Sequence, residues 1–359
     1  MNSGKGLRGL AYAAGTLVCL GTTLPLFHGN RWWLRIFDFP RIQITALGAA
    51  FLGYNLARYP HLTRAEKRFA ALVGLAVAGQ LIQIFPYTPL ARKRVLHASD
   101  NGPDIQLLTC NVFQDNRTVD KLKELIDQRD PDLILLTETD QWWLDQLTDL
   151  KTRYPHTLLQ PLSNYYGMAL YSKFKLINPE IRFLIKNDIP SMRCLVEIHP
   201  GHHFLFYGVH PEPPGSAKPN GGIRGSGPRD AELVVVAKEL RNAKHPVIVA
   251  GDFNDVAWSH TTRLFQRISR LLDPRIGRGF YNSFNANHHF FRYPLDHLFH
   301  SEHFSLVNFE RLPHVGSDHF PLCVRLRLTP TAPLKQEPPQ PQTNDFQEAN
   351  KILRESPRE

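Results

Sequence analysis

The stretch VAGDFNDVAWS, residues 249–259, joins a run of apolar residues directly to an acid and an amide. The apolar run Val247–Ala250 is typical of a buried strand, and Gly251 leads from it into Asp252 and Asn254. Residues two apart in a strand share a face, so both polar side chains can point the same way. Asp and Asn are also common turn residues. On this stretch alone, a plain turn and a functional site are equally good interpretations.

Polar residues follow other apolar runs in the same way. From residue 105 onward, short apolar runs alternate with amphipathic stretches at 118–128 and 230–243, which predicts a mixed sheet system with helices outside. Each polar residue alone is more typical of a turn, but strand ends of one sheet system converge, so together they predict a shared pocket. Besides Asp252 and Asn254, these residues are Asn111, Glu138, His210, Asp296, Asp318 and His319.

The types of these side chains indicate their chemistry. Carboxylate and amide oxygens are ligands for magnesium or manganese, whereas zinc sites use more His and Cys. The pairs 202–203 and 288–289 are histidines without zinc-site spacing. Two histidines and a further aspartate beside a hard cation suit phosphoryl transfer, because they neutralise charge on phosphate oxygens and activate water.

The order of the motifs resembles the endonuclease/exonuclease/phosphatase superfamily, which includes DNase I-like nucleases, sphingomyelinases and inositol-phosphate phosphatases. The resemblance covers about residues 105–328 and implies an α+β fold, a four-layer α/β sandwich of two packed sheets with helices outside. It also implies a catalytic domain that uses Mg²⁺, with Mn²⁺ as the alternative. The matching motifs are TCNV, LLTETD, GVHPEPP, AGDFND, PLDHLF and GSDHFPL.

The resemblance implies a metal site and an activated water. Glu138 would be the main metal ligand, with Asn111 beside it. Asp318 would complete the metal site or its surroundings, and Asp252 would orient and deprotonate the attacking water.

The resemblance also implies a phosphate-binding side of the site. Asn254 would hydrogen-bond the phosphate, and His319, held by Asp296, would stabilise its oxygens. His210 would contact the phosphate from the other side, and Arg193 stands where the family often has a phosphate-facing arginine. The weaker candidates are Tyr166 and Arg229.

Residues 1–89 contain three apolar stretches, at 10–27, 42–57 and 69–85, whose interiors lack Lys, Arg, Asp and Glu. A helix needs about 20 residues to cross a bilayer. We therefore expect an anchor of three transmembrane helices, with a cleaved signal peptide or a packed soluble helical domain as alternatives. A linker would occupy 90–104, and the Pro- and Gln-rich tail 329–359 would be disordered.

Basic residues are concentrated in the expected anchor. Residues 1–98 hold 12 Lys/Arg and 2 Asp/Glu, whereas 99–328 hold 26 of each, so no strong nucleic-acid footprint is present. The Lys/Arg of the connecting loops do not decide the membrane orientation. HPEPPG, DVAWS and LDH are similar to a bacterial branch of membrane proteins associated with glycopeptide resistance. That branch implies a multi-pass protein of the bacterial inner membrane with an extracytoplasmic catalytic domain.

These features together predict a membrane-anchored, Mg-dependent phosphoesterase acting on a phosphate ester or pyrophosphate. The expected partners are the lipid bilayer and a phosphorylated, lipid-linked substrate, and no protein partner is evident. A membrane-tethered nuclease and an inactive binding module remain as alternatives. The Pro/Gly-rich segment 211–228 is either a lip over the site or a spacer.

Overall fold

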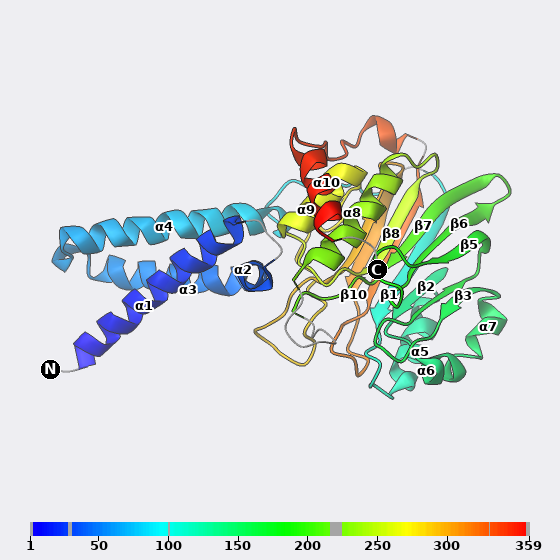
Figure 1. Ribbon diagram of the computed structural model, residues 1–359, viewed down its shortest axis with the longest axis horizontal. Helices are drawn as coiled ribbons and strands as arrows, with labels where there is room; N and C mark the ends of the chain where they lie inside the picture. Colours follow the sequence, from blue (N-terminus) through cyan, green and yellow to red (C-terminus); the bar gives the residue numbers. More distant parts are fainter. Residues whose placement is uncertain (1–2, 28–30, 100, 216–224, 330, 357–359) are drawn as a thin grey trace. The chain divides into compact units, whose positions relative to one another are not determined.

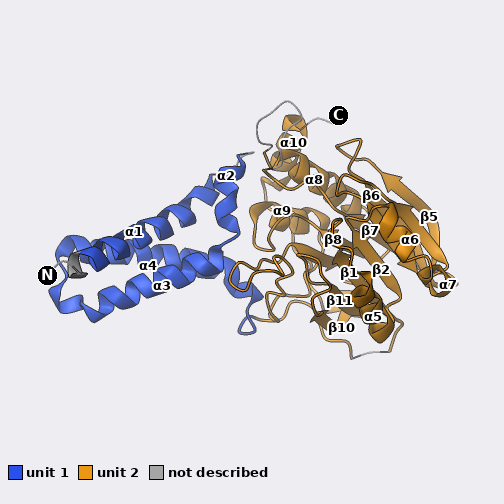
Figure 2. Ribbon diagram, turned by 90° about the horizontal axis from the view of Figure 1, so that it is seen from below, with its two compact units in different colours: residues 1–91 blue, residues 92–359 orange. Residues whose placement is uncertain are grey.

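The computed structural model describes residues 3–27, 31–99, 101–215, 225–329 and 331–356. The chain forms two compact units, residues 1–91 and residues 92–359 (Figure 2). Each unit has its own hydrophobic core.

The first unit is helical. Its core lies where the long helices meet, around Val18, Ile44 and Val73. The last helix starts at a capping box, in which Glu66 N donates to Thr63 Oγ1 and Thr63 N donates to the Glu66 carboxylate at 2.7 Å. The helices are α1 (Ser3–Thr23), α2 (Trp32–Arg35), α3 (Arg41–Ala57) and α4 (Arg64–Ile84).

Two segments of this unit, Gly6–Leu26 and Arg64–Tyr87, are long and apolar enough to cross a membrane. In each segment, 22% of the most apolar 18-residue stretch is buried, so most of that stretch faces outward. Helix α3 forms where the second span was expected, but it has 17 residues and is shorter than these two. It ends at Ala57, and the chain continues into the short 3-10 helix Tyr59–His61.

The second unit contains two β-sheets (Figure 1). The six-stranded sheet has the order β10-β11-β1-β2-β4-β3, and the five-stranded sheet has the order β5-β6-β7-β8-β9. The first sheet consists of β1 (Asp104–Asn111), β2 (Leu133–Thr137), β3 (His156–Gln160), β4 (Met168–Ser172), β10 (Phe304–Arg311) and β11 (Leu322–Leu328). The second consists of β5 (Lys175–Arg182), β6 (Ser191–His199), β7 (His202–Val209), β8 (Val247–Asp252) and β9 (Asp296–His300).

The inner faces of the two sheets pack against each other through residues such as Leu107, Leu135, Phe206 and Ile248. Figure 1 shows one group of helices outside each sheet, which agrees with the expected layered α+β sandwich. The helices outside the six-stranded sheet are α5 (Val119–Arg129), α6 (Gln141–Gln146) and α7 (Leu150–Arg153). Those outside the five-stranded sheet are α8 (Gly227–Arg241), α9 (His260–Ser269) and α10 (Asp345–Glu355).

The strand register aligns the polar strand ends. β1 and β2 are parallel, with Asn111 opposite Thr137, so Asn111 lies next to the strand that leads into Glu138. β7 and β8 are also parallel, with Val209 opposite Gly251. The carboxyl ends of these four strands therefore place their next residues at one edge of each sheet.

The C-terminal tail differs from its prediction. Helix α10 packs on α8 and α9, with Ala349 buried in the outer core, and its Asp345 pairs with Arg267 at 2.8 Å. The prediction of a disordered tail is thus wrong for residues 345–355. The apolar residues Phe346, Ala349 and Leu353 follow a helical period within a polar, Pro-rich composition.

The expected linker 90–104 is also partly incorporated into the second unit. Val95 is buried in the core between the sheets, and His97 forms a bridge with Leu306 of β10. Leu306 N further donates to Leu96 O at 2.8 Å. From Val95 onward, the chain is therefore part of the second unit.

Candidate active site

Three strand ends from the two sheets are joined by one amide. Asn111 Nδ2 donates to Glu138 Oε1 at 2.8 Å and to Asp252 Oδ2 at 3.1 Å. Asn111 ends β1 and Glu138 follows β2 of one sheet, whereas Asp252 ends β8 of the other. The structure thus brings together polar residues that lie up to 141 positions apart in the sequence.

A buried Asp–His–Asp group lies at the same place. His319 Nδ1 is 2.6 Å from Asp296 Oδ2, and His319 Nε2 is 3.6 Å from Asp252 Oδ2. Burial disfavours the imidazolium, but Asp296 and Asp252 outweigh it and raise the pKa of His319 to about 10. Burial raises the pKa of Asp252. His319 therefore carries a positive charge at neutral pH.

His210 lies on the other side of Asp252. Its Nε2 is 3.8 Å from Asp252 Oδ2, and its ring centroid is 5.5 Å from that of Tyr166. Burial lowers the pKa of His210 to about 3, with the charge on His319 acting in the same direction. His210 is therefore neutral. Among the described residues its Nδ1 has no hydrogen-bond partner, which leaves this nitrogen for a ligand.

The acidic side chains of the site suit a divalent cation. Burial raises the pKa of Glu138, and the negative charge of Asp318 adds to this effect. Together with Asp252 and Asp296 they make four carboxyl groups around the imidazolium of His319. Excess buried negative charge is costly unless a cation balances it. The ligand atoms of Asp252, Asp296 and His319 lie within 4.8 Å of one another and could also hold a metal ion.

Asn111 presents its nitrogen, and not its oxygen, to this group of carboxylates. Its Oδ1 accepts from Phe113 N at 3.0 Å. This geometry differs from the expected role of Asn111 as a metal ligand, because only the oxygen of an amide binds a hard cation. Asn111 instead holds Glu138 and Asp252 at a fixed separation.

The turn after β8 depends on Gly251 and on a buried arginine. Gly251 has a φ of +138°, and a Cβ there would lie 2.0 Å from Val209 O, so only glycine fits. Asn254 has a φ of +51°, and its backbone N donates to Asp252 Oδ1 at 2.8 Å. Arg229 Nη1 donates to Asn254 O at 2.8 Å. Arg229, a weak site candidate in the sequence, is therefore a positioning residue for this turn.

The side chain of Asn254 is tied to the segment that follows β7. Its Nδ2 donates to Pro211 O at 3.0 Å, which places it one residue from His210. An amide nitrogen has two hydrogens, so one is left for a phosphate oxygen. This geometry is compatible with the expected role of Asn254.

Two serines that the sequence analysis did not select support the site. Ser317 Oγ donates to Asn111 O at 2.7 Å and accepts from His319 N at 2.9 Å. Ser283 Oγ accepts from Asp296 N at 3.0 Å. Ser317 could have been found from its place in the GSDHFPL motif. Ser283 has no local signal, because it lies 13 residues before the aspartate that it supports.

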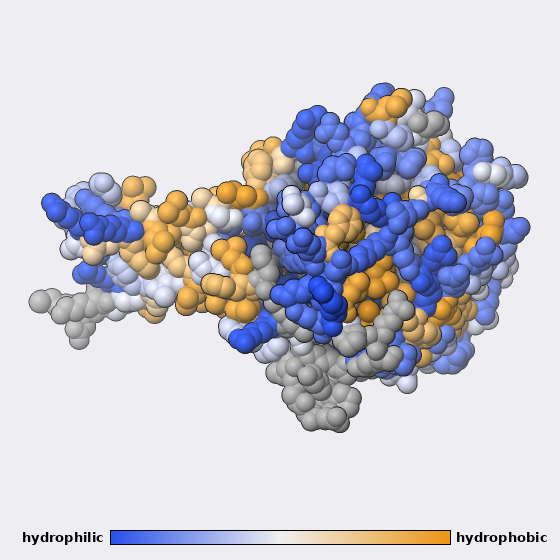
Figure 3. Space-filling model, turned by 45° about the horizontal axis from the view of Figure 1, so that its top comes forward, coloured by the Kyte–Doolittle hydropathy of each residue, from blue (hydrophilic) through white to orange (hydrophobic). Residues whose placement is uncertain are grey.

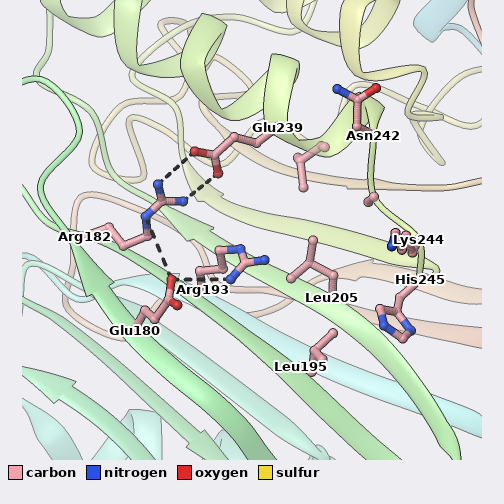
Figure 4. Close-up of a pocket in the computed structure, with 11 residues that line it drawn as sticks. Glu180, Arg182, Arg193, Leu195, Leu205, Glu239, Asn242, Lys244 and His245 are labelled. Carbon is pink, nitrogen blue, oxygen red and sulfur yellow. Dashed lines mark hydrogen bonds and ion pairs between the residues drawn. The ribbon is translucent and has the colours of Figure 1, made fainter.

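Arg193 lies outside this group. Met192 and Cys194 of β6 face the core between the sheets, so Arg193 points to the opposite face. There it lines a pocket of about 620 Å³, with Nη1 3.4 Å from Glu180 Oε2 (Figure 4). Asp252 shares its strand face with Ile248 and Ala250, which face the inner core. The expected contact of Arg193 with the phosphate is therefore not found, because strand alternation turns its side chain away.

Comparison with known proteins finds the same fold in other chains and identifies a protein family. Residues 108–319 match the family model described as Endonuclease/Exonuclease/phosphatase family. The human Nocturnin catalytic domain with bound sulfate is similar in fold, with 21% identity and a TM-score of 0.51, over 64% of this chain and 97% of that chain. ANGEL2, described as a 2′,3′-cyclic phosphatase, has 14% identity and a TM-score of 0.50, over 64% and 97%. No curated protein sequence matches the chain. Because the family match spans more than half of its residues, the chain belongs to the endonuclease/exonuclease/phosphatase family.

Proposed function

We propose that the protein is a membrane-anchored, divalent-metal-dependent phosphoesterase that hydrolyses a phosphate ester or pyrophosphate of a membrane-associated substrate. Members of its family are hydrolases that act on phosphoester bonds. The main observation behind the proposal is that the side chains of Glu138, Asp252 and His319 lie close together at the junction of the two sheets.

The side chains of this junction fit the parts of a phosphoryl transfer. The His319 imidazolium, held by Asp296, stabilises negative charge that develops on the phosphate oxygens. Asp252 accepts a proton from the attacking water, since its carboxylate is fixed by Asn254 N and Asn111 Nδ2. Neutral His210 and Asn254 bind the phosphate from the opposite side.

The metal would be held by Glu138 and Asp318, two carboxylates whose charges interact with His319. When bound, Mg²⁺ supplies positive charge that polarises the phosphate and assists deprotonation of water. The metal is assigned to these two residues and not to His319, because His319 Nδ1 is occupied by Asp296 and its ring is protonated.

The helices of residues 1–91 support the membrane part of the proposal. Leu10, Leu75 and Ile82 expose 71%, 72% and 70% of their surface, and Figure 3 shows many hydrophobic side chains over this unit on the face in view. In a packed soluble domain such residues would be buried. An anchor raises the effective concentration of a lipid substrate at the site. A third span by α3 and an extracytoplasmic position at a bacterial inner membrane are part of the same proposal.

The test is hydrolysis by the full-length protein purified in detergent. Lipid phosphates, lipid pyrophosphates, bis-p-nitrophenyl phosphate and DNA are supplied with and without Mg²⁺. We expect turnover of the phosphoesters with Mg²⁺ and a loss of at least about 10³-fold in Asp252→Asn, because the water then lacks its base. Arg193→Ala is the control and should retain activity, since Arg193 faces the other side of its sheet.

Three outcomes would contradict the proposal. Wild-type turnover by Asp252→Asn would refute the mechanism. Cleavage of DNA alone would identify a nuclease. Absence of Mg²⁺-dependent turnover on every substrate would favour a binding module.

A further inference from the structure

We propose that the loop 286–292, ANHHFFR, is a lipid-contacting element that docks the active site on an anionic membrane surface. The inference deepens the proposed function and rests on it, since it names the surface from which the substrate is taken. Four features of the second unit support it.

The first feature is the exposure of two large apolar side chains at the loop tip. Phe290 is 83% exposed and Phe291 is 56% exposed, within an exposed run from Asn287 to Phe291. Phenylalanine is normally among the buried residues of a folded protein. Adjacent exposed apolar residues that are framed by polar ones are typical of an interaction site.

The second feature is the attachment of the loop to the catalytic residues. Phe284, at the base of the loop, has its ring centroid 4.9 Å from that of His319. Ala286 N donates to Asp318 O at 2.6 Å, and Asn285 N donates to Phe291 O at 3.3 Å. The position of the loop tip is therefore tied through its backbone to the residues that we assign to catalysis.

The third feature is positive charge at the base of the loop, where Arg292 directly follows Phe291. The guanidinium groups of Arg292 and Arg311 lie 5.0 Å and 4.3 Å from the centroid of the Phe320 ring. Arg292 Nε donates to His288 O at 2.5 Å, which keeps this arginine at the base of the tip. Aromatic side chains next to basic ones are the pattern of segments that lie at the interface of anionic lipids.

The fourth feature is the short segment that connects the second unit to the proposed membrane anchor. Arg278 Nη2 donates to Val95 O at 2.7 Å, so the segment preceding the loop holds the residue at which the chain enters the unit. Eight residues lead from Tyr87, the end of an apolar helical segment, to Val95. An extended chain of this length spans at most about 28 Å. The proposed anchor would hold Val95 within this distance of the bilayer, which favours lipid over a second protein as the partner.

The direct test measures whether the loop enters a bilayer. The full-length protein is reconstituted in phosphatidylglycerol vesicles whose acyl chains carry bromine, a quencher of tryptophan fluorescence. We expect the tryptophan introduced by Phe290→Trp to lose at least about half of its fluorescence, since an interfacial side chain lies about 5–10 Å deep. The matched control is His202→Trp. His202 is exposed at the start of β7, the end of that strand opposite His210, and we expect no added quenching there.

A second test separates docking from chemistry. We expect the double variant Phe290→Ser/Phe291→Ser to hydrolyse bis-p-nitrophenyl phosphate in detergent as the wild type does. Its turnover of phospholipid in vesicles should fall about tenfold, because an interfacial segment binds through its buried apolar area.

Failure of the loop proposal can be distinguished from failure of the proposed function. If no substrate is hydrolysed, the proposed function fails, while the quenching experiment still decides on the loop. Equal quenching of Phe290→Trp and His202→Trp would overturn the inference. A change of oligomeric state in the double variant, without any change in vesicle turnover, would overturn it in favour of a protein interface.

Discussion

His319 keeps its proton in a buried position where burial alone would remove it. Asp296 accepts from its Nδ1 at 2.6 Å, and Asp252 lies 3.6 Å from its Nε2. The charge of this residue therefore depends on two aspartates contributed by two neighbouring antiparallel strands, β8 and β9. Such dependence makes the pH profile of the enzyme sensitive to a single substitution.

The first prediction concerns Asp296→Asn. The wild type should keep the His319-dependent part of its activity up to alkaline pH, because the raised pKa of His319, about 10, holds the proton. In the variant this pKa falls, so the alkaline limb of the kcat profile should move to lower pH and kcat at pH 8 should drop about 10²-fold or more. Steady-state kinetics between pH 6 and 10 provide the measurement. An unchanged alkaline limb would contradict the proposed role of Asp296.

The second prediction concerns the buried acid Glu232 of α8. Burial, with Glu212 adding to it, raises the pKa of Glu232 to about 8, against about 4.3 in an unfolded chain. The folded state thus holds the proton more tightly than the unfolded state does. The resulting stability is fully present below about pH 4 and is lost as the pH rises towards 8.

Glu232→Gln should remove this pH dependence. Between pH 5 and 8.5 its melting temperature should fall less than that of the wild type, with a difference in unfolding free energy of up to a few kcal/mol. Thermal unfolding in detergent at several pH values measures it. Glu124→Gln, on the exposed face of α5, should melt as the wild type does at each pH. Parallel curves for Glu232→Gln and the wild type would disprove the assignment.

At the scale of elements, three strands at sheet edges have weak apolar patterns in the sequence. These strands are β3, β5 and β10, and each stands at an edge of its sheet. An edge strand has one unpaired side and carries more polar residues, so its apolar pattern is weak. In β5, positions 178–180 are exposed, and the register to β6 shifts between Ile177 and Glu180.

The third prediction concerns α10. Phe346 packs against the outer core of α8 and α9, and the Arg241 guanidinium lies 5.0 Å from its ring centroid. Phe346→Ala should lower the free energy of unfolding by about 1–3 kcal/mol, because it removes a half-buried ring. The melting temperature would then fall by several degrees, whereas the exposed Gln347→Ala should leave it unchanged. Equal melting of both variants would show that α10 does not contribute to stability.

At the scale of the whole molecule, the site exists only where the two sheets meet. Asn111 and Glu138 belong to one sheet, and Asp252 and Asp296 belong to the other. The cation that we assign to Glu138 and Asp318 beside the six-stranded sheet would balance the negative charge of Asp252 and Asp296 of the other sheet. Binding of metal should stabilise the entire second unit.

The fourth prediction follows from this arrangement. Mg²⁺ at 100 times its dissociation constant should stabilise the folded wild type by about 2.7 kcal/mol and raise its melting temperature by several degrees. Glu138→Gln should lose most of this increase, because it removes the carboxylate that we assign to the metal. Chelation with EDTA should abolish the increase and the activity together. A full Mg²⁺ response in Glu138→Gln would move the metal to the Asp252–Asp296–His319 group.

The sequence by itself determined the types of side chain in the site and their places at strand ends. It did so because apolar periodicity and the residues that follow it are local, and a single chain displays them. The tertiary structure alone decided that Arg193 faces away, that Asn111 presents its nitrogen, that Ser283 supports Asp296 and that α10 packs on α8. These outcomes depend on strand register, on the facing of alternate residues and on contacts between distant segments. The distances between these residues result from the packing of the whole domain, and no short stretch of sequence displays them.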